Sequence, residues 1–251
     1  MRRFVNPAVA SLLLLAHTWA LAAAPTFVGK AEDFSNDDQT NLTLTLPAHA
    51  TDDFGLITCT WNESGTTPTV TDPTGYTVAI KEIQTDGRDR GSAIYHKKFT
   101  SGSETNPTIA FSAANSDHSC NIHIFRGVHT SDPLDATITQ NFGQNERNPT
   151  NEDITPDNAD AAIVLIQHSS NGEDISAAGA PSGYTLGDWN VVGGGVSNDA
   201  WLAVAYLLGA TGLQNPGAWT NTGVSTSTDY TTYTVALRAA ASGSALLRRR
   251  R

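Results

Sequence analysis

Apolar and polar residues alternate along much of this chain with a period of two, the pattern of half-buried β-strands. Leu42, Leu44 and Leu46, for example, alternate with two threonines. The pattern predicts two series of strands, at residues 54–61, 76–85, 93–100, 108–113 and 120–128, and at residues 161–168, 184–192, 200–209, 218–223 and 231–239. Residues 136–142 form a further strand-like stretch between the series. No sustained 3.6-residue apolar stripe occurs after residue 22, so we expect an all-β protein.

The two series resemble each other in sequence, which indicates an internal duplication. The segment that begins at Pro47 aligns with the one at Pro156, an offset of 109 residues, and the turn PTGYT at Pro73 aligns with PSGYT at Pro181, an offset of 108. Two more matches follow in the same order, Tyr95 with Tyr206 at 111 and Phe125-Arg126 with Leu237-Arg238 at 112. Slowly drifting offsets are what loop insertions produce in two diverged copies.

We expect repeat one (about residues 25–130) and repeat two (about residues 136–240) to form one jelly-roll-like, double-sheet sandwich with interleaved strands. Two separate sheets would leave open edges, and no Pro/Ser/Gly-rich linker divides the copies. Two adjacent sandwich domains are the alternative. The last strand of each repeat has its apolar residues on one face, namely Cys120, Ile122 and Ile124 in repeat one and Tyr233, Val235 and Leu237 in repeat two. According to the alignment these are opposite faces of the strand. This strand is therefore either buried on both faces or aligned one residue out of register.

The N-terminus has the pattern of an export signal, with Arg2 and Arg3 before an apolar stretch that ends in small residues. We predict a signal peptide at residues 1–22, with cleavage near Ala22 or Ala23, a sandwich at residues 23–240 and a flexible basic tail at residues 241–251. The apolar stretch is short for a transmembrane helix, so we expect no membrane span in the mature form.

Charge argues against nucleic acid as a partner. The chain has 25 acidic and 15 basic residues, and six of the arginines lie at the two ends, at Arg2, Arg3 and Arg248 to Arg251. The body between them is strongly acidic and repels polyanions.

Cys59 and Cys120 are the only cysteines, and both lie in predicted strands. The alignment gives them His168 and Thr232 as counterparts, so both cysteines are missing together from copy two. In an oxidising compartment the natural interpretation is a disulfide, and two buried thiols that never meet are the alternative.

The motifs of catalysis are missing. Gly195-Val196-Ser197 does not continue into a nucleophile elbow, and His118 and His123 fall on opposite faces of one predicted strand, which argues against a shared metal ion. Acidic turns such as Asp52-Asp53 and Glu152-Asp153 lack the spacing of a defined calcium loop, although loop carboxylates commonly bind calcium in exported β-proteins. A hydrolase is a further alternative, which would need a deep pocket with two facing carboxylates, and nothing in the sequence marks such a pair. We therefore predict a protein that is not an enzyme and needs no cofactor, with calcium left open.

Aromatic residues suggest a different role. Trp189, next to Asp188 and Asn190, is the tryptophan that we most expect to be exposed, and Tyr184 precedes it in the same predicted strand. Such side chains stack on sugar rings, so they are candidate glycan-binding residues. Trp201 lies in a stretch that is apolar on both faces and is expected in the core.

One motif resembles a known group of proteins. Phe125-Arg126-Gly127-Val128, followed by Pro133-Leu134-Asp135, is similar to a signature of poorly characterised exported bacterial and phage β-sandwich proteins, which also carry a turn like the one at Pro73. The resemblance implies a non-enzymatic component of a cell surface, an extracellular matrix or filament, or a virion.

We therefore expect a secreted or surface-exposed structural or adhesive module that acts by self-association or surface binding. In one version the segment Thr26, Phe27, Val28 and Gly29 pairs with the sheet edge of a neighbouring copy. A carbohydrate-binding module with a polysaccharide ligand is the alternative.

Overall fold

The computed structural model describes residues 22–35, 39–62, 69–84, 90–112, 117–144, 146–170, 177–192, 200–223 and 229–241. The predicted signal peptide and basic tail fall almost wholly outside these residues. The described chain is all-β, as the alternation predicts. Its strands are β1 Thr26–Ser35, β2 Asn41–Thr43, β3 Phe54–Asn62, β4 Val70–Thr71, β5 Thr77–Gln84, β6 Arg90–Lys98, β7 Thr108–Phe111, β8 His118–Arg126, β9 Thr139–Gly143, β10 Ala161–Ser170, β11 Thr185–Val192, β12 Ala200–Ala210 and β13 Asp229–Leu237.

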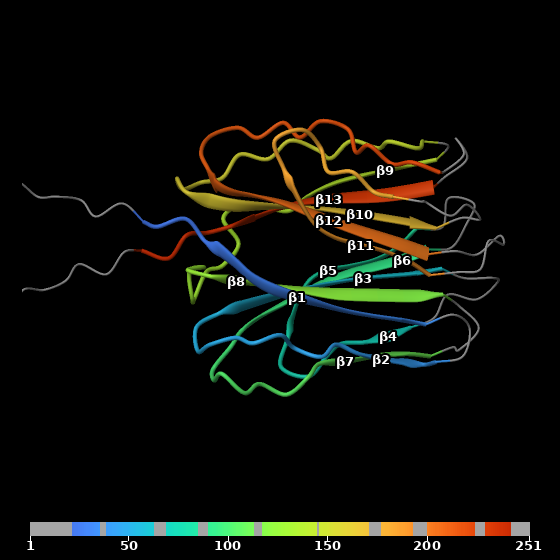
Figure 1. Cartoon of the computed structure of the whole chain (residues 1–251), viewed down its shortest axis with the longest axis horizontal. Coiled ribbons are helices and arrows are strands. Elements are labelled where there is room, and N and C mark those ends of the chain that lie inside the picture. Colours follow the sequence, from blue (N-terminus) through green and yellow to red (C-terminus); the bar gives the residue numbers. More distant parts are fainter. Residues whose placement is uncertain are drawn as a thin grey trace, which may run out of the picture.

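These strands form two five-stranded sheets and one three-stranded sheet, all antiparallel (Figure 1). The first sheet has the order β1-β8-β3-β6-β5, the second β9-β13-β10-β12-β11, and the small sheet β2-β7-β4. In Figure 1 the small sheet lies below the first sheet and the second sheet lies above it. Irregular segments cover the far face of the second sheet.

The two halves of the chain do not exchange strands. Every strand of the first and small sheets lies within residues 26–126, and every strand of the second lies within residues 139–237. The expected interleaving is therefore wrong for the described strands. Each half closes its own sheet over short connections, as sequentially close antiparallel strands tend to do, and the two sheets then pack face to face. The two large sheets have the same strand order when their strands are numbered along each half of the chain. The matching strands are β1 with β9, β8 with β13, β3 with β10, β6 with β12 and β5 with β11.

Three apolar clusters separate the layers. One lies between the small and first sheets, one between the two large sheets, and one under the segments that cover the second sheet. The alternation within β8 sends Cys120, Ile122 and Ile124 into the first cluster, and that within β13 sends Tyr233, Val235 and Leu237 into the second cluster. Both strands are buried on both faces. Burial on both faces, and not an alignment error in these strands, therefore explains why their apolar residues point to opposite sides.

Local backbone features also correspond between the halves. Asp52 and Asp160, the two non-glycine residues with positive φ (69° and 63°) in the described chain, precede β3 and β10 and lie 108 residues apart. The same offset relates the bulge between Val78 and Ile80 to that between Leu186 and Asp188.

The offset of 109 expected for β3 and β10 is thus one residue too long. Phe54 pairs with Phe125 as Ala162 pairs with Leu237, and these two pairs occupy the same place in their sheets. The counterpart of Cys59 is consequently Gln167, not His168.

Candidate functional site

The predicted disulfide is present. Cys59 of β3 and Cys120 of β8 lie directly opposite each other in the ladder and are joined by an S–S bond. Both residues are fully buried beneath the small sheet. The bond therefore joins two central strands of the first sheet, where it serves stability.

The predicted glycan-binding residues lie on the outer face of the second sheet. The bulge at Gly187 brings Tyr184 and Trp189 to the same face, where both are half-buried against the outer apolar cluster. Burial raises the pKa of Tyr184 to about 12. Trp201, in the same cluster, is buried as expected.

The predicted assembly segment belongs to β1, which pairs along its whole length with β8 of the same chain. Ser35 is the single fully buried residue of this edge strand, while Phe27, Val28 and Ala31 are partly buried against the apolar clusters. Near its start, Phe27 stacks on Tyr206 of the second sheet, with ring centroids 5.0 Å apart. The strand therefore contacts both large sheets.

A polar cluster, which we call the seam, joins the edge strands β1 and β11. Lys30 forms an ion pair with Asp188, whose side chain is buried. Burial and the neighbouring Asp188 carboxylate raise the pKa of Glu32, also on β1. His123 of β8 is buried, and its Nε2 atom has no hydrogen-bond partner among the described residues. Burial lowers the pKa of His123 to about 4.

Sequence reasoning missed the seam because Lys30 and Asp188 are 158 residues apart. Neither residue carries a motif, and only the face-to-face packing of the two sheets brings their edges together.

The histidines do not converge on a metal ion. His118 stacks on Phe111 of the small sheet, with centroids 3.9 Å apart, whereas His123 faces the second sheet. Across the described ranges, no group of three or more His, Cys, Asp or Glu side chains is arranged to hold a metal ion.

Arg126 and Arg238, at the ends of β8 and β13, each bind a buried carboxylate. Arg126 binds Asp53 through both Nε and Nη2, at 2.8 and 2.9 Å. Arg238 binds Asp135 through Nε at 3.0 Å and also pairs with Asp132. Although burial opposes it, the hydrogen bonds from Arg126 lower the pKa of Asp53. The Arg126 and Asp135 positions of the motif thus fasten the ends of strands.

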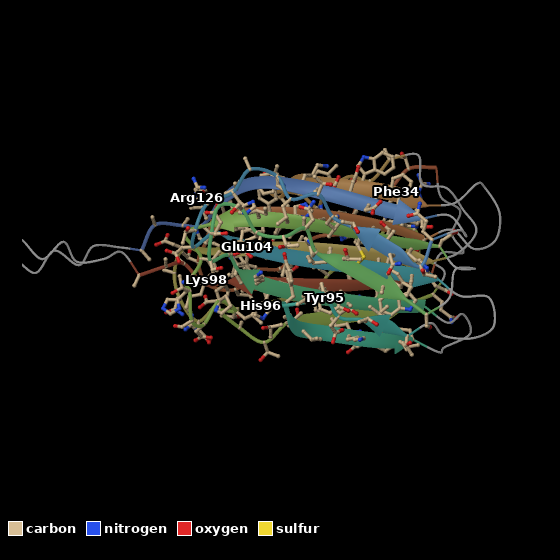
Figure 2. All side chains as sticks on the ribbon, turned by 90° about the horizontal axis from the view of Figure 1, so that it is seen from below. Phe34, Tyr95, His96, Lys98, Glu104 and Arg126 are labelled. Carbon is tan, nitrogen blue, oxygen red and sulfur yellow. A yellow bond between two sulfur atoms is a disulfide. The ribbon has the colours of Figure 1, made fainter. Side chains whose placement is uncertain are left out.

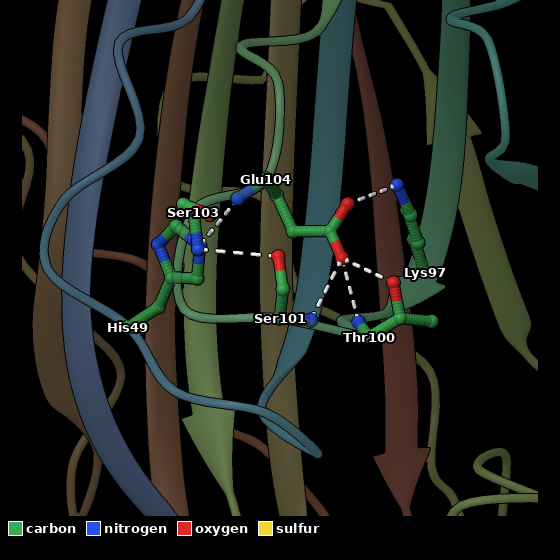
Figure 3. Close-up of polar contacts among 6 residues, drawn as sticks. All are labelled: His49, Lys97, Thr100, Ser101, Ser103 and Glu104. Atoms are coloured by element: carbon green, nitrogen blue, oxygen red, sulfur yellow. Dashed lines mark hydrogen bonds and ion pairs between the residues drawn. The ribbon is translucent and has the colours of Figure 1, made fainter.

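At the end of the sandwich where Arg126 and Lys98 also lie (Figure 2), Glu104 organises a turn (Figure 3). One carboxylate oxygen accepts hydrogen bonds from the N–H and hydroxyl of Thr100, at 2.6 and 2.8 Å, and the other binds Lys97 at 2.6 Å. The hydrogen bond from Lys97, with those from Thr100, lowers the pKa of Glu104 to about 2.

His49 supports the same turn and is not free to act as a base. Its Nε2 accepts a hydrogen bond from the backbone N–H of Glu104 at 3.2 Å, and its Nδ1 donates to the carbonyl of Pro47 at 2.7 Å.

Two hollows flank this turn. The inner hollow, of about 380 Å³, lies between the ends of β5 and β6 and the connection between the halves; its lining residues include Phe54, Thr77, His96, Lys98, Thr130 and Ser131. The outer hollow, of about 440 Å³, lies beside Glu104 and Asn106. Gly75 and Lys97 line both. Burial lowers the pKa of His96, which stacks on Phe54 at a centroid distance of 5.5 Å.

The chain matches no protein-family model, no curated protein and no solved structure. The described residues contain no helix that is long and apolar enough to cross a membrane.

Proposed function

We propose that this protein is an exported, non-enzymatic structural or adhesive module that self-associates through the edges of its large sheets. Export rests on the predicted signal peptide, and the buried disulfide is compatible with an oxidising extracellular environment. The setting is a cell surface, an extracellular matrix or filament, or a virion, as the motif resemblance implies.

The distribution of exposed apolar side chains carries the proposal. Within the described strands, every large hydrophobic residue that is exposed lies in an edge strand: Phe34 in β1, Val78 and Ile83 in β5, Phe142 in β9 and Leu186 in β11. Edge strands present unpaired backbone groups, and exposed hydrophobic edges favour pairing with another chain.

The β5/β9 side carries three of these five exposed residues, and the β1/β11 side carries two. A hydrogen bond of 2.5 Å between Gln140 and Glu82 places β9 beside β5, so Val78, Ile83 and Phe142 lie on one side of the sandwich. On the other side, the seam ties β1 to β11. We therefore assign the main contact between copies to the β5 edge.

Solution size tests this assignment. Light scattering of the mature protein over a wide concentration range should show assemblies larger than the monomer. The double variant Val78→Lys/Ile83→Lys should be monomeric, because two charges on the edge oppose pairing. Leu213→Lys is the matched control, since Leu213 is exposed but lies outside the strands, and should assemble normally. A wild-type protein that stays monomeric throughout would refute self-association.

A strand-exchange version uses β1 instead. Here Thr26–Gly29, with the rest of β1, leaves its own β8 and adds to the β8 of a second copy. Nine of the ten residues of β1 are at least partly exposed, which supports this version. Deletion of residues 23–35 should then abolish assembly, and oligomers that persist unchanged after the deletion argue against it.

We also propose that the halves are diverged copies of one jelly-roll-like unit. The identical strand orders, the paired positive-φ aspartates and the corresponding bulges support a common origin. Within the first half, β1-β8-β3-β6 and β2-β7-β4 follow the order of a jelly roll, except that β5 joins the first of these sheets.

Carbohydrate binding is the second candidate function. Tyr184 and Trp189 support it because they share one face and are partly exposed. Glycan-array binding that is lost in Trp189→Ala would favour this function, whereas a blank array with a folded protein would count against it.

A further inference from the structure

The two hollows beside Glu104 have the chemistry of a polar ligand site. Hydroxyl and amide side chains dominate their walls: Thr77, Thr100, Thr130 and Ser131 in the inner hollow, and Thr74, Thr105, Asn106 and Thr108 in the outer hollow. Such groups exchange hydrogen bonds with a ligand rich in hydroxyls. His96, whose ring stacks on the buried Phe54, adds an aromatic surface to the inner hollow.

Charge distinguishes the inner hollow from the rest of the molecule. Its described lining contains Lys97 and Lys98 and no carboxylate, although the chain as a whole has a net charge of −10. Both lysines are paired with a carboxylate outside this lining, so the hollow attracts a negatively charged ligand through whichever lysine can give up its partner.

The two lysines are not equally available. Lys97 is held by Glu104, whose side chain is only 8% exposed and which has further donors in Thr100. Lys98 pairs with Asp52 at 2.8 Å, but the two side chains are 39% and 62% exposed. Exposed pairs of this kind contribute little stability, so a ligand carboxylate can replace Asp52 at a small cost.

We propose that the inner hollow binds a sugar unit that bears a carboxylate, as in the uronic acids of acidic polysaccharides. Lys98 receives the carboxylate, and the surrounding threonines and Ser131 contact the ring hydroxyls. The outer hollow shares Gly75 and Lys97 with the inner one, so it holds the next unit of the same chain. This site is separate from both the β5 edge and Trp189.

Calorimetric titration with trigalacturonate tests the proposal, with maltotriose as the neutral trisaccharide. Trigalacturonate should bind at least ten times more tightly than maltotriose, with an affinity that falls as salt is added. Lys98→Met should weaken trigalacturonate binding at least tenfold. Lys81→Met is the matched control, because Lys81 also pairs with a partly exposed carboxylate, Asp72, but lies outside both hollows. It should bind like the wild type.

Three results would overturn the proposal: no binding of trigalacturonate, equal losses in Lys98→Met and Lys81→Met, or a loss in Trp189→Ala that Lys98→Met does not share. The last result would transfer binding to the Trp189 face. Assembly is measured separately on the β5 variants, so failure of this site and failure of self-association are distinguishable.

Discussion

The halves of this protein build the same five-stranded sheet but fasten its outer cover in different ways. In the first half, the cover is a regular sheet, β2-β7-β4, that lies on an apolar cluster over the disulfide. In the second half, the cover consists of irregular segments joined by isolated bridges such as Thr150 to Ala218 and Ala177 to Thr222. Side-chain hydrogen bonds hold these segments to the sheet.

The difference is clearest at the position of the disulfide. Gln167 and Thr232 face each other in the second sheet where Cys59 and Cys120 are bonded in the first. Thr232 donates to the carbonyl of Thr150 at 2.9 Å, and Gln167 accepts a hydrogen bond from Asn221 at 3.3 Å. One half thus uses this position to join two strands, and the other uses it to hold its cover. The same pair of strand positions can hold either a disulfide or hydrogen-bonding side chains, because in both halves these positions face a buried layer beneath the cover.

The largest expected effect is loss of the disulfide. The double variant Cys59→Ala/Cys120→Ala should lower the free energy of unfolding by about 4 kcal/mol, because the bond closes a loop of about 60 residues in the unfolded chain. Urea unfolding of the variant and the wild type measures the difference. A loss below about 1 kcal/mol would show that the cover, and not the bond, secures the first half.

Acid should weaken the seam between the halves. His123 has a folded-state pKa of about 4 against an ordinary value of 6.5, so between these values the unfolded chain binds a proton that the folded protein does not. The contribution of His123 to the free energy of unfolding should be fully present above pH 6.5 and should fall by about 3 kcal/mol as the pH is lowered to 4. Below pH 4 this residue should cause no further loss.

The variant His123→Leu isolates this contribution, because Lys30, Glu32 and Asp188 stay in place. Its free energy of unfolding should fall less than that of the wild type between pH 6.5 and pH 4. Parallel curves for the two proteins would mean that the buried histidine does not set the acid sensitivity.

The two arginine pairs should differ in importance. Arg238→Met should lower the melting temperature more than Arg126→Met, since Arg238 is less exposed (24% against 57%) and pairs with two carboxylates. We expect decreases of a few degrees, because each change leaves a buried aspartate without its cation. Calorimetry at neutral pH measures both, and a larger effect of Arg126→Met would reverse the assignment.

Local patterns predicted more of this fold than of its possible sites. Alternation located most central strands, and the absence of both cysteines from the aligned second half, with an expected oxidising compartment, predicted the disulfide. The stretch 218–223, in contrast, was expected to be a strand and forms only isolated bridges at Ala218 and Thr222, because Asn151 and Asn221 hold this segment through side chains. The seam and the hollows combine residues from distant segments, so spacing along the chain carried no signal of them.

The smallest effect compares a threonine of β13 that holds the second cover with a threonine of β2 in the first cover. Thr232→Val removes a buried hydrogen bond to the carbonyl of Thr150 and should cost about 1 kcal/mol of unfolding free energy. Thr43→Val removes the hydroxyl contact of 3.0 Å with Thr108 on the exposed side of the small sheet and should change stability by less than about 0.5 kcal/mol. Urea unfolding of both variants decides the matter. The first cover is held by its backbone ladder and apolar cluster, so loss of one side-chain hydrogen bond should matter little there. Equal effects of the two substitutions would mean that the second cover depends on side-chain hydrogen bonds no more than the first.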